Sequence, residues 1–434
     1  MSATRDPVAA AAAAWPAVRA LDLDARLGRA AASRAGLQAA GDHIVAVAAA
    51  ETTATPGFAR RELASALLFA DALPDLAQAI RPREVPARTG RTRLHFEPYG
   101  VVFGWHAANS PIWVPTLVAL SALVGGNTVI GRPSRRASRT TRAVLEAISA
   151  SWPHGAVQVA DLDPAAAEAL IVHPGVGAVI AHASTETCRR HLGLLAAAYA
   201  DGAPLRPYIP EASGNDACVV LAGADLAAAA QAIALGGFAN AGQLCMAAKR
   251  VIVDRAVWPS LEPALAAAIA RITRDGVHRT EVQTGTSAGD QGAAAIADAM
   301  ARGGRFVVGG PARDGVVAAT LIALEAAEAT GAVMWRDEVF APVRCVVVCD
   351  GVDEALALAN ASRYGLGAAL FGGTPAERES FTRGVRAARV VVDEGPLYQD
   401  PHLVVGGVAD SGYGGARPKL EQLVWAKRVH VAAG

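Results

Sequence analysis

The sequence has few cysteines and few aromatic residues. Its 434 residues include 5 Cys, and aromatic residues make up 5% of the chain. The cysteines, at positions 188, 218, 245, 345 and 349, contain no CxxC pair and are odd in number, which argues against a disulfide framework and a structural zinc site. The 10 His residues show no metal-binding spacing such as HExxH. We therefore expect no metal.

The sequence also has no excess of either charge, because 40 Lys and Arg residues balance 40 Asp and Glu residues. Such a balance argues against binding to nucleic acid along the whole chain. No apolar run reaches the roughly 20 residues that span a bilayer. The alanine tract at 9–14 lacks the leucine-rich core of a secretion signal. These features predict a cytoplasmic protein without a nucleic-acid or membrane partner.

Apolar residues are abundant, at 52% of the chain, and the length suggests two or three domains. Helical stretches within 21–50 and 58–79 precede a series of β-branched runs separated by alanine-rich segments. This alternation predicts an α/β fold with parallel, doubly wound sheets. The candidate strands are 99–103, 128–130, 157–159 and 176–180, and then 217–221, 250–253, 306–308, 344–348 and 389–392.

Cys245 is the most informative cysteine, because it ends the segment NAGQLC and lies 34 positions after Glu211 in PEASGN. A thiol beside Gly and Gln is open to a substrate, and a carboxylate from a separate segment can accept a proton from water or from the thiol. The alternative for any cysteine in so apolar a chain is a small core residue. We prefer that interpretation for the four other cysteines.

These two segments resemble those of the aldehyde dehydrogenase superfamily, in which the nucleophile lies in a Gly-Gln-x-Cys segment and the base lies a few tens of residues earlier. Further segments resemble the family in the same order along the chain, from about residue 15 to residue 432. They are GGNTVIGRPS at 125–134, DEVFAPV at 337–343, NASRYGL at 360–366 and GGVADSGYG at 406–414.

The resemblance implies NAD(P)+-dependent oxidation of an aldehyde to a carboxylic acid. The Cys245 thiolate would attack the aldehyde, and the Asn109 side chain and the Cys245 N–H would bind the oxyanion of the thiohemiacetal. Hydride transfer to the nicotinamide would leave a thioester, which water activated by Glu211 would hydrolyse. Asn109 also precedes Ser-Pro, so it could instead be a turn residue.

Six cofactor contacts follow from the same resemblance: Arg132, Ser134, Arg135, Ser184, Glu338 and Phe340. Arg132 stands where the family has a lysine that contacts the adenosine ribose. Arg135 stands where many NAD-preferring relatives have an acidic residue, and a guanidinium there favours a 2′-phosphate. The sequence therefore favours NADP over NAD. Arg136, Arg139 and Arg142 nearby fit a solvated helix face.

Two further segments belong to the cofactor contacts that the family comparison implies. Ser184 would approach the pyrophosphate at a helix N-terminus, although Ala183 replaces the family's glycine. Glu338 would bind a hydroxyl of the nicotinamide ribose, and Phe340 would line the same pocket. An ordinary surface carboxylate is the alternative for Glu338.

The resemblance also divides the chain into two Rossmann-like domains. Residues 1–83 and 99–211 would bind the cofactor, and residues 212–423 would form the catalytic domain. A bridging hairpin from 84–98, together with 424–434, would join copies into a homodimer or homotetramer.

Two alternatives to the hydrolytic enzyme stay open. One is a CoA-acylating aldehyde dehydrogenase or acyl-thioester reductase, although the retained Glu211 favours hydrolysis. The other is an oligomeric nucleotide-binding protein without activity. The sequence does not indicate which aldehyde is the substrate.

Overall fold

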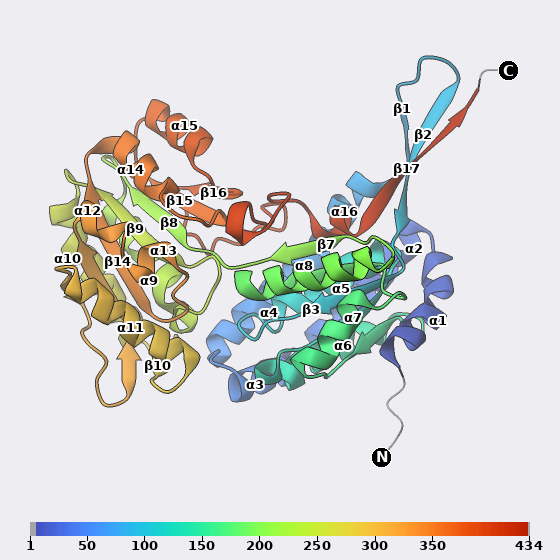
Figure 1. The fold of residues 1–434 in the computed structure, drawn as a ribbon, viewed down its shortest axis with the longest axis horizontal. Coiled ribbons are helices and arrows are strands. Elements are labelled where there is room, and N and C mark those ends of the chain that lie inside the picture. Colours follow the sequence, from blue (N-terminus) through green and yellow to red (C-terminus); the bar gives the residue numbers. More distant parts are fainter. Residues whose placement is uncertain (1–5, 433–434) are drawn as a thin grey trace.

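The computed structural model describes residues 6–432, which form two α/β units and a small sheet that extends away from them (Figure 1). The first residues of the predicted cofactor-binding domain, 1–5, and the last of the predicted bridging segment, 433–434, lie outside the described residues.

The chain begins with helices, most of which start at a side-chain cap. Asp6, Asp22 and Thr55 each accept a hydrogen bond from a backbone N–H of the first turn, which satisfies a donor that the helix leaves free. The elements are α1 (Pro7–Arg19), α2 (Leu23–Ala39), α3 (Gly41–Glu51), α4 (Pro56–Leu76) and η1 (Ala77–Ile80).

The segment Pro56–Ile80 is long and apolar enough to cross a bilayer, judged by length and composition alone. A core helix passes the same test, and α4 packs against α2, α3 and α5. Its inner face buries Ala59, Ala66, Phe69 and Leu73. The apolar character of α4 is therefore accounted for by burial in the first unit.

The first unit contains a five-stranded parallel sheet with the order β5-β4-β3-β6-β7. Because the strand order reverses beside β3, a crevice is expected at the carboxyl ends of β3 and β6. The elements are β3 (Val101–Trp105), α5 (Trp113–Val124), β4 (Thr128–Arg132), η2 (Arg135–Ala137), α6 (Ser138–Ser149), β5 (Val157–Val159), α7 (Pro164–Val172), β6 (Ala178–His182), α8 (Thr185–Ala200) and β7 (Tyr208–Glu211).

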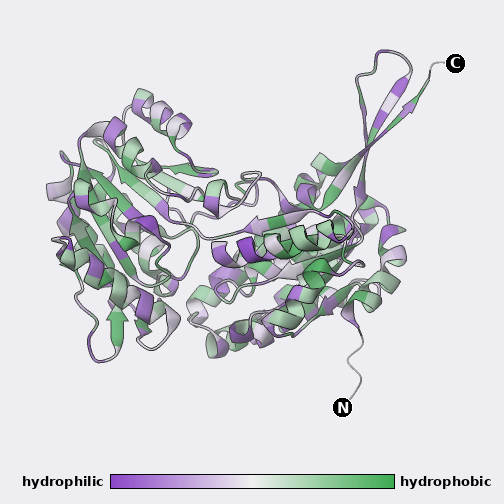
Figure 2. Cartoon of the chain, viewed as in Figure 1, coloured by the Kyte–Doolittle hydropathy of each residue, from purple (hydrophilic) through white to green (hydrophobic). Residues whose placement is uncertain are grey.

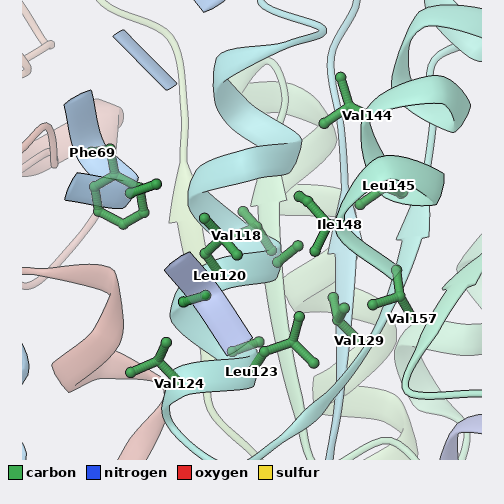
Figure 3. Packing of buried hydrophobic residues seen from close by; sticks show 14 of the residues in the cluster. Phe69, Val118, Leu120, Leu123, Val124, Val129, Val144, Leu145, Ile148 and Val157 are labelled. Atoms are coloured by element: carbon green, nitrogen blue, oxygen red, sulfur yellow. The ribbon is translucent and has the colours of Figure 1, made fainter. Parts of the chain in front are cut away.

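The core of this unit forms around α5, which is apolar on all sides and is buried along nearly its whole length. Figure 3 shows Val118 and Leu123 of α5 beside Val129 of β4 and Ile148 of α6. The helix that begins just after the predicted oxyanion residue is thus fixed by packing, so the loop ahead of it has a defined position.

The second unit contains a seven-stranded sheet with the order β11-β13-β14-β9-β8-β15-β16, in which only the β11–β13 pair is antiparallel. In Figure 2 the strands of this sheet are mostly green, that is apolar, and helices surround them. Both sheets confirm the predicted doubly wound α/β class.

The elements of the second unit alternate in the same way as those of the first. They are β8 (Asp216–Val220), α9 (Leu226–Phe238), η3 (Ala239–Gly242), β9 (Ala248–Asp254), α10 (Trp258–Arg274), β10 (Glu281–Gln283), α11 (Ser287–Ala301), β11 (Arg305–Val308), β12 (Val316–Ala318), β13 (Thr320–Leu324), α12 (Ala326–Ala329), α13 (Val333–Arg336), β14 (Val343–Cys349), α14 (Gly351–Asn360), β15 (Gly367–Phe371), α15 (Pro375–Gly384) and β16 (Arg389–Val392).

Two strands have no local sequence pattern that predicts them. β7 contains Pro210 and ends in a carboxylate, and β15 begins with Gly367 and two alanines, which are residues that strands disfavour. β15 pairs on one side with β8 and on the other with β16. Partner strands, rather than propensity, therefore determine these two elements.

The small sheet consists of β1 (Arg83–Val85), β2 (Arg91–Pro98) and β17 (Val424–Val431), which pair antiparallel. The chain reaches β17 through η4 (Ala409–Ser411) and α16 (Lys419–Gln422). β17 lies at an edge of this sheet and exposes Trp425, Val429 and Val431. These strands coincide with the segments expected to bridge copies, but bridging itself stays a prediction.

Candidate active site

The carboxyl edge of the first sheet brings together residues from four strands. β3 ends at Trp105, β4 at Arg132, β6 at His182 and β7 at Glu211. Parallel strands place their carboxyl ends at the same edge of a sheet, where ligands bind in α/β proteins. The chain passes from Glu211 directly into the second unit, so this edge faces the nucleophile's unit.

Cys245 lies in the segment between α9 and β9, residues 239–247, which we call the nucleophile loop. Three successive residues of this loop, Asn240, Ala241 and Gly242, have positive φ angles of 51°, 55° and 69°. For alanine this conformation costs about 1–2 kcal/mol, and such strain often accompanies functional sites. A Cβ on Gly242 would lie 2.5 Å from the carbonyl oxygen of Ala341, so only glycine fits there.

The Arg344 side chain binds this loop through hydrogen bonds to backbone carbonyls. Its fully buried guanidinium donates to the carbonyl oxygens of Gly242 and Ala341, each at 2.8 Å, and to that of Val343 at 2.7 Å. It thereby ties the nucleophile loop to the segment that contains Glu338 and Phe340. The sequence predicts only a strand at Arg344, because no local pattern links this residue to the nucleophile loop.

The Cys245 side chain is free and half-buried, and burial raises the pKa of its thiol to about 12. Lys249 lowers this pKa, whereas Glu338, Asp216 and Glu211 raise it. In the cofactor-free protein the sulfur is therefore mainly a thiol at neutral pH. The four other cysteines are also free and are buried among core residues.

Asn109 lies in the β3–α5 loop and meets the nucleophile loop. The Asn240 amide donates to the Asn109 carbonyl oxygen at 3.4 Å, and Thr53 Oγ1 donates to Asn240 Oδ1 at 3.1 Å. Two segments of the first unit thus contact Asn240 of the second unit. These contacts place the predicted oxyanion residue beside the loop of the predicted nucleophile.

Glu62 anchors the chain just after Asn109. One carboxylate oxygen of this buried residue accepts hydrogen bonds from Ser110 Oγ and from the N–H groups of Ile112 and Trp113, each at 2.8 Å. Burial raises the Glu62 pKa to about 7, and these hydrogen bonds lower it. The sequence does not predict this function of Glu62, because nothing in its helix pattern links it to a loop 48 positions away.

We expect Glu62→Ala to reduce aldehyde oxidation because the Asn109 loop loses its anchor. A displacement of about 1 Å at a reacting centre can cost roughly 100-fold in rate. The measurement is kcat at saturating substrate, with the thermal midpoint recorded to separate local from global effects. Unchanged kcat in a stable variant would contradict this function of Glu62.

Glu211 pairs with a lysine from the C-terminal segment. The Lys419 ammonium contacts Glu211 Oε1, and it also donates to the Val405 carbonyl oxygen at 3.0 Å. The two side chains are only 3% and 9% exposed, for Lys419 and Glu211 respectively. Burial raises the Glu211 pKa and Lys419 opposes that shift. The sequence predicts Glu211 as a candidate base but contains no local signal for its partner.

Glu338 pairs with Lys249 in the same way. Lys249 Nζ lies 3.0 Å from Glu338 Oε1, and the side chains are 2% and 12% exposed. The N–H of Gly214 donates to the same carboxylate at 3.1 Å. Glu338 is therefore not an ordinary surface carboxylate. Its predicted contact with a ribose stays a prediction.

Arg132 and Arg135 form a positive pair at the end of β4. The Arg132 guanidinium stacks on Trp105, 4.1 Å from the ring centre, and donates to the Leu162 carbonyl oxygen at 3.3 Å. Burial is the main cause that lowers the Arg132 pKa, and the charge of the exposed Arg135 lowers it further. Two nearby carboxylates, Asp161 and Asp163, act in the opposite direction.

Ser184 caps α8, where its hydroxyl accepts from the N–H of Thr187 at 3.2 Å. A helix N-terminus at the end of β6 offers free N–H donors to an anion. Phe340 is half-buried, and its N–H donates to Gln291 Oε1 at 3.4 Å. Guanidiniums and a helix N-terminus are groups that bind phosphates, and a carboxylate can accept hydrogen bonds from ribose hydroxyls.

Comparison with known proteins identifies the family. The model of the aldehyde dehydrogenase family matches residues 2–426. A vanillin dehydrogenase of Pseudomonas fluorescens is 32% identical over 96% of this chain and 88% of its own length. A succinate-semialdehyde dehydrogenase [NADP(+)] of Mycobacterium bovis is 28% identical over 74% of this chain and 69% of its own.

A solved structure agrees on the fold. The crystal structure of an NAD-dependent aldehyde dehydrogenase from Sinorhizobium meliloti is 24% identical and superposes with a TM-score of 0.89, covering 99% of this chain and 86% of that chain. The chain belongs to the aldehyde dehydrogenase family and is an NAD(P)-dependent oxidoreductase that acts on an aldehyde.

Proposed function

We propose that the protein oxidises its aldehyde to a free carboxylic acid through a covalent intermediate on Cys245. The observation that supports this most is the meeting of the Asn109 loop with the nucleophile loop, through the Asn240 amide and the Asn109 carbonyl at 3.4 Å. A nucleophile and an oxyanion donor must come from adjacent segments for an aldehyde to lie between them.

In this mechanism the Cys245 sulfur bonds to the aldehyde carbon, and the thiol proton passes to Glu211 or to water. The oxyanion that forms is stabilised by the Asn109 amide and the Cys245 N–H, each worth about 3 kcal/mol of barrier. The thiohemiacetal carbon then loses hydride, for which a bound nicotinamide would supply the acceptor, and the adduct becomes a thioester. Glu211 as a carboxylate then removes a proton from water as the water attacks the thioester, which releases the acid and the thiol.

The cofactor would be held by Ser184 and the α8 N-terminus at its phosphates, and by Glu338 at a ribose. Arg132 and Arg135 would face the adenosine ribose. Because this part of the site presents two guanidiniums, we favour NADP over NAD. Glu211 and Glu338 each pair with a buried lysine, Lys419 and Lys249 respectively.

Arg135→Glu should weaken NADP use while sparing NAD. Loss of a charge-assisted contact costs about 1.5–3 kcal/mol, or roughly 10-fold to 100-fold in kcat/KM for NADP. The measurement is kcat/KM for both cofactors in the wild type, in Arg135→Glu and in Arg142→Glu. Arg142 is an exposed arginine of α6 near Glu146, which makes it a matched control. An unchanged ratio of NADP to NAD use in Arg135→Glu would exclude this contact.

The relatives, rather than the site, support a proposal for the substrate class. Since a vanillin dehydrogenase covers most of the chain at 32% identity, we propose an aromatic aldehyde as the substrate. The test is 340 nm absorbance with vanillin, benzaldehyde, succinic semialdehyde and an aliphatic aldehyde, each with NAD, NADP and added CoA. Reduction without CoA supports the hydrolytic enzyme. Activity that requires CoA would favour the acylating alternative.

We also propose that copies assemble into a dimer or tetramer through the three-stranded sheet. β17 is an edge strand and exposes Trp425, Val429 and Val431. Edge strands with exposed apolar side chains are suited to pairing with another chain. A cytoplasmic location remains the expectation from composition.

A further inference from the structure

We propose that Lys249 is a positioning residue that keeps the Cys245 thiol reactive. Its ammonium fixes the backbone of the nucleophile loop and supplies the positive charge that favours the thiolate. The inference rests on the proposed function of Cys245 as the nucleophile, and it assigns to Lys249 a task that sequence analysis did not.

The geometry uses all three donors of the ammonium. Lys249 Nζ lies 2.7 Å from the Cys245 carbonyl oxygen, 2.8 Å from the Leu244 carbonyl oxygen and 3.0 Å from Glu338 Oε1. Lys249 itself is part of β9, which is flanked by β8 and β14 in the middle of the sheet. A rigid strand thus holds the charge in place, and two successive carbonyls hold the loop against it.

Lysine is rare in this protein, which makes its position informative. The 40 basic residues include only three lysines, Lys249, Lys419 and Lys427. Lys249 and Lys419 are buried at the candidate site, where each pairs with a carboxylate. A compact ammonium can direct its donors to two carbonyls and a carboxylate at once, whereas the planar guanidinium has a fixed fork. Arginine at 249 should therefore replace lysine only in part.

The charges around the thiol explain why one cation matters. Among the described residues, Lys249 on β9 favours ionisation of Cys245, and three carboxylates oppose it. These are Glu338 after α13, Asp216 on β8 and Glu211 on β7. Arg363 and Tyr364 lie beside the Glu338 backbone, since the Tyr364 hydroxyl accepts from the Glu338 N–H at 3.4 Å and from Arg363 at 2.8 Å. Without Lys249, its opposing charge would no longer offset the three carboxylates, which raise the thiol pKa.

The test measures the thiol directly in the cofactor-free protein. The rate of Cys245 alkylation by iodoacetamide is followed by peptide mass spectrometry between pH 6 and pH 10. Lys249→Met should shift the alkylation profile to higher pH and slow the reaction at pH 8 by roughly 10-fold, the factor for one pKa unit. Lys249→Arg should recover part of the rate. Lys427→Met, at an exposed position of β17, is the matched control and should match the wild type.

An unchanged pH profile in a folded Lys249→Met protein would overturn the inference. If that variant does not fold, Glu338→Gln decides: it removes an opposing charge, so the profile should move to lower pH, and no movement would count against the proposal. Cys245→Ala separates this inference from the proposed function. Aldehyde oxidation that survives Cys245→Ala would overturn the function itself, whereas an unchanged Lys249→Met profile would overturn only the assignment of Lys249.

Discussion

Cys245→Ala is expected to abolish aldehyde-dependent reduction of NAD(P)+, with a loss of about 10⁴-fold or more, because no covalent adduct can form. Cys245→Ser should lose nearly as much, since a hydroxyl is a far weaker nucleophile. The measurement is initial rate at 340 nm over a range of enzyme concentrations high enough to detect the residual activity. Dissociation constants for the cofactor should change little, because binding does not require the sulfur.

A second cysteine supplies the control for this substitution. Cys349 is fully buried at the end of β14, so Cys349→Ala removes a thiol from the core and not from the site. It should retain aldehyde oxidation and lose only a small amount of stability. Equal losses in Cys245→Ala and Cys349→Ala, or full activity in Cys245→Ala, would contradict the assignment of the nucleophile.

Glu211→Gln is expected to separate the two halves of the reaction. Acylation of Cys245 should still proceed, so a stopped-flow trace should show a burst of about one reduced cofactor per active site. The later steady state should fall by about 10²–10⁴-fold, because the amide cannot activate water. A full steady-state rate in this variant would show that another group activates the water.

The pH dependence of Glu211 has a defined sign. Burial raises the Glu211 pKa, and the carboxylate must be deprotonated to act as a base. The steady-state rate of the wild type should therefore rise with pH through a pKa above the usual value for glutamate, and this limb should disappear in Glu211→Gln.

Lys419→Met tests the same limb from the other side. Lys419 lowers the Glu211 pKa, so its removal should move the limb of the wild type to higher pH. A limb that stays in place after Lys419→Met would assign it to a different group. A limb that persists in Glu211→Gln would do the same.

Much of the fold was predictable, because the signals that determine it are local. The strands at 157–159 and 389–392 begin and end where their β-branched residues predicted. Cys245 and Glu211 are predicted from short segments, because the residues that surround a candidate nucleophile or base are its neighbours in the sequence. Their order along the chain also resembles that of the family.

The charge partners of the site were decided by the tertiary structure alone. Lys419 and Glu211 are 208 positions apart, and Glu62 and Ser110 are 48 apart. No local pattern predicts such pairs, because they depend on which strands lie side by side and on how the C-terminal segment returns to the first unit. Burial determines how strongly these lysines act. On the surface they would be ordinary solvated charges, whereas in the buried site Lys419 lowers the Glu211 pKa and Lys249 lowers the Cys245 pKa. The sequence by itself thus determined the family motifs from which the candidate groups are predicted, and the tertiary structure determined the electrostatic setting in which these groups lie.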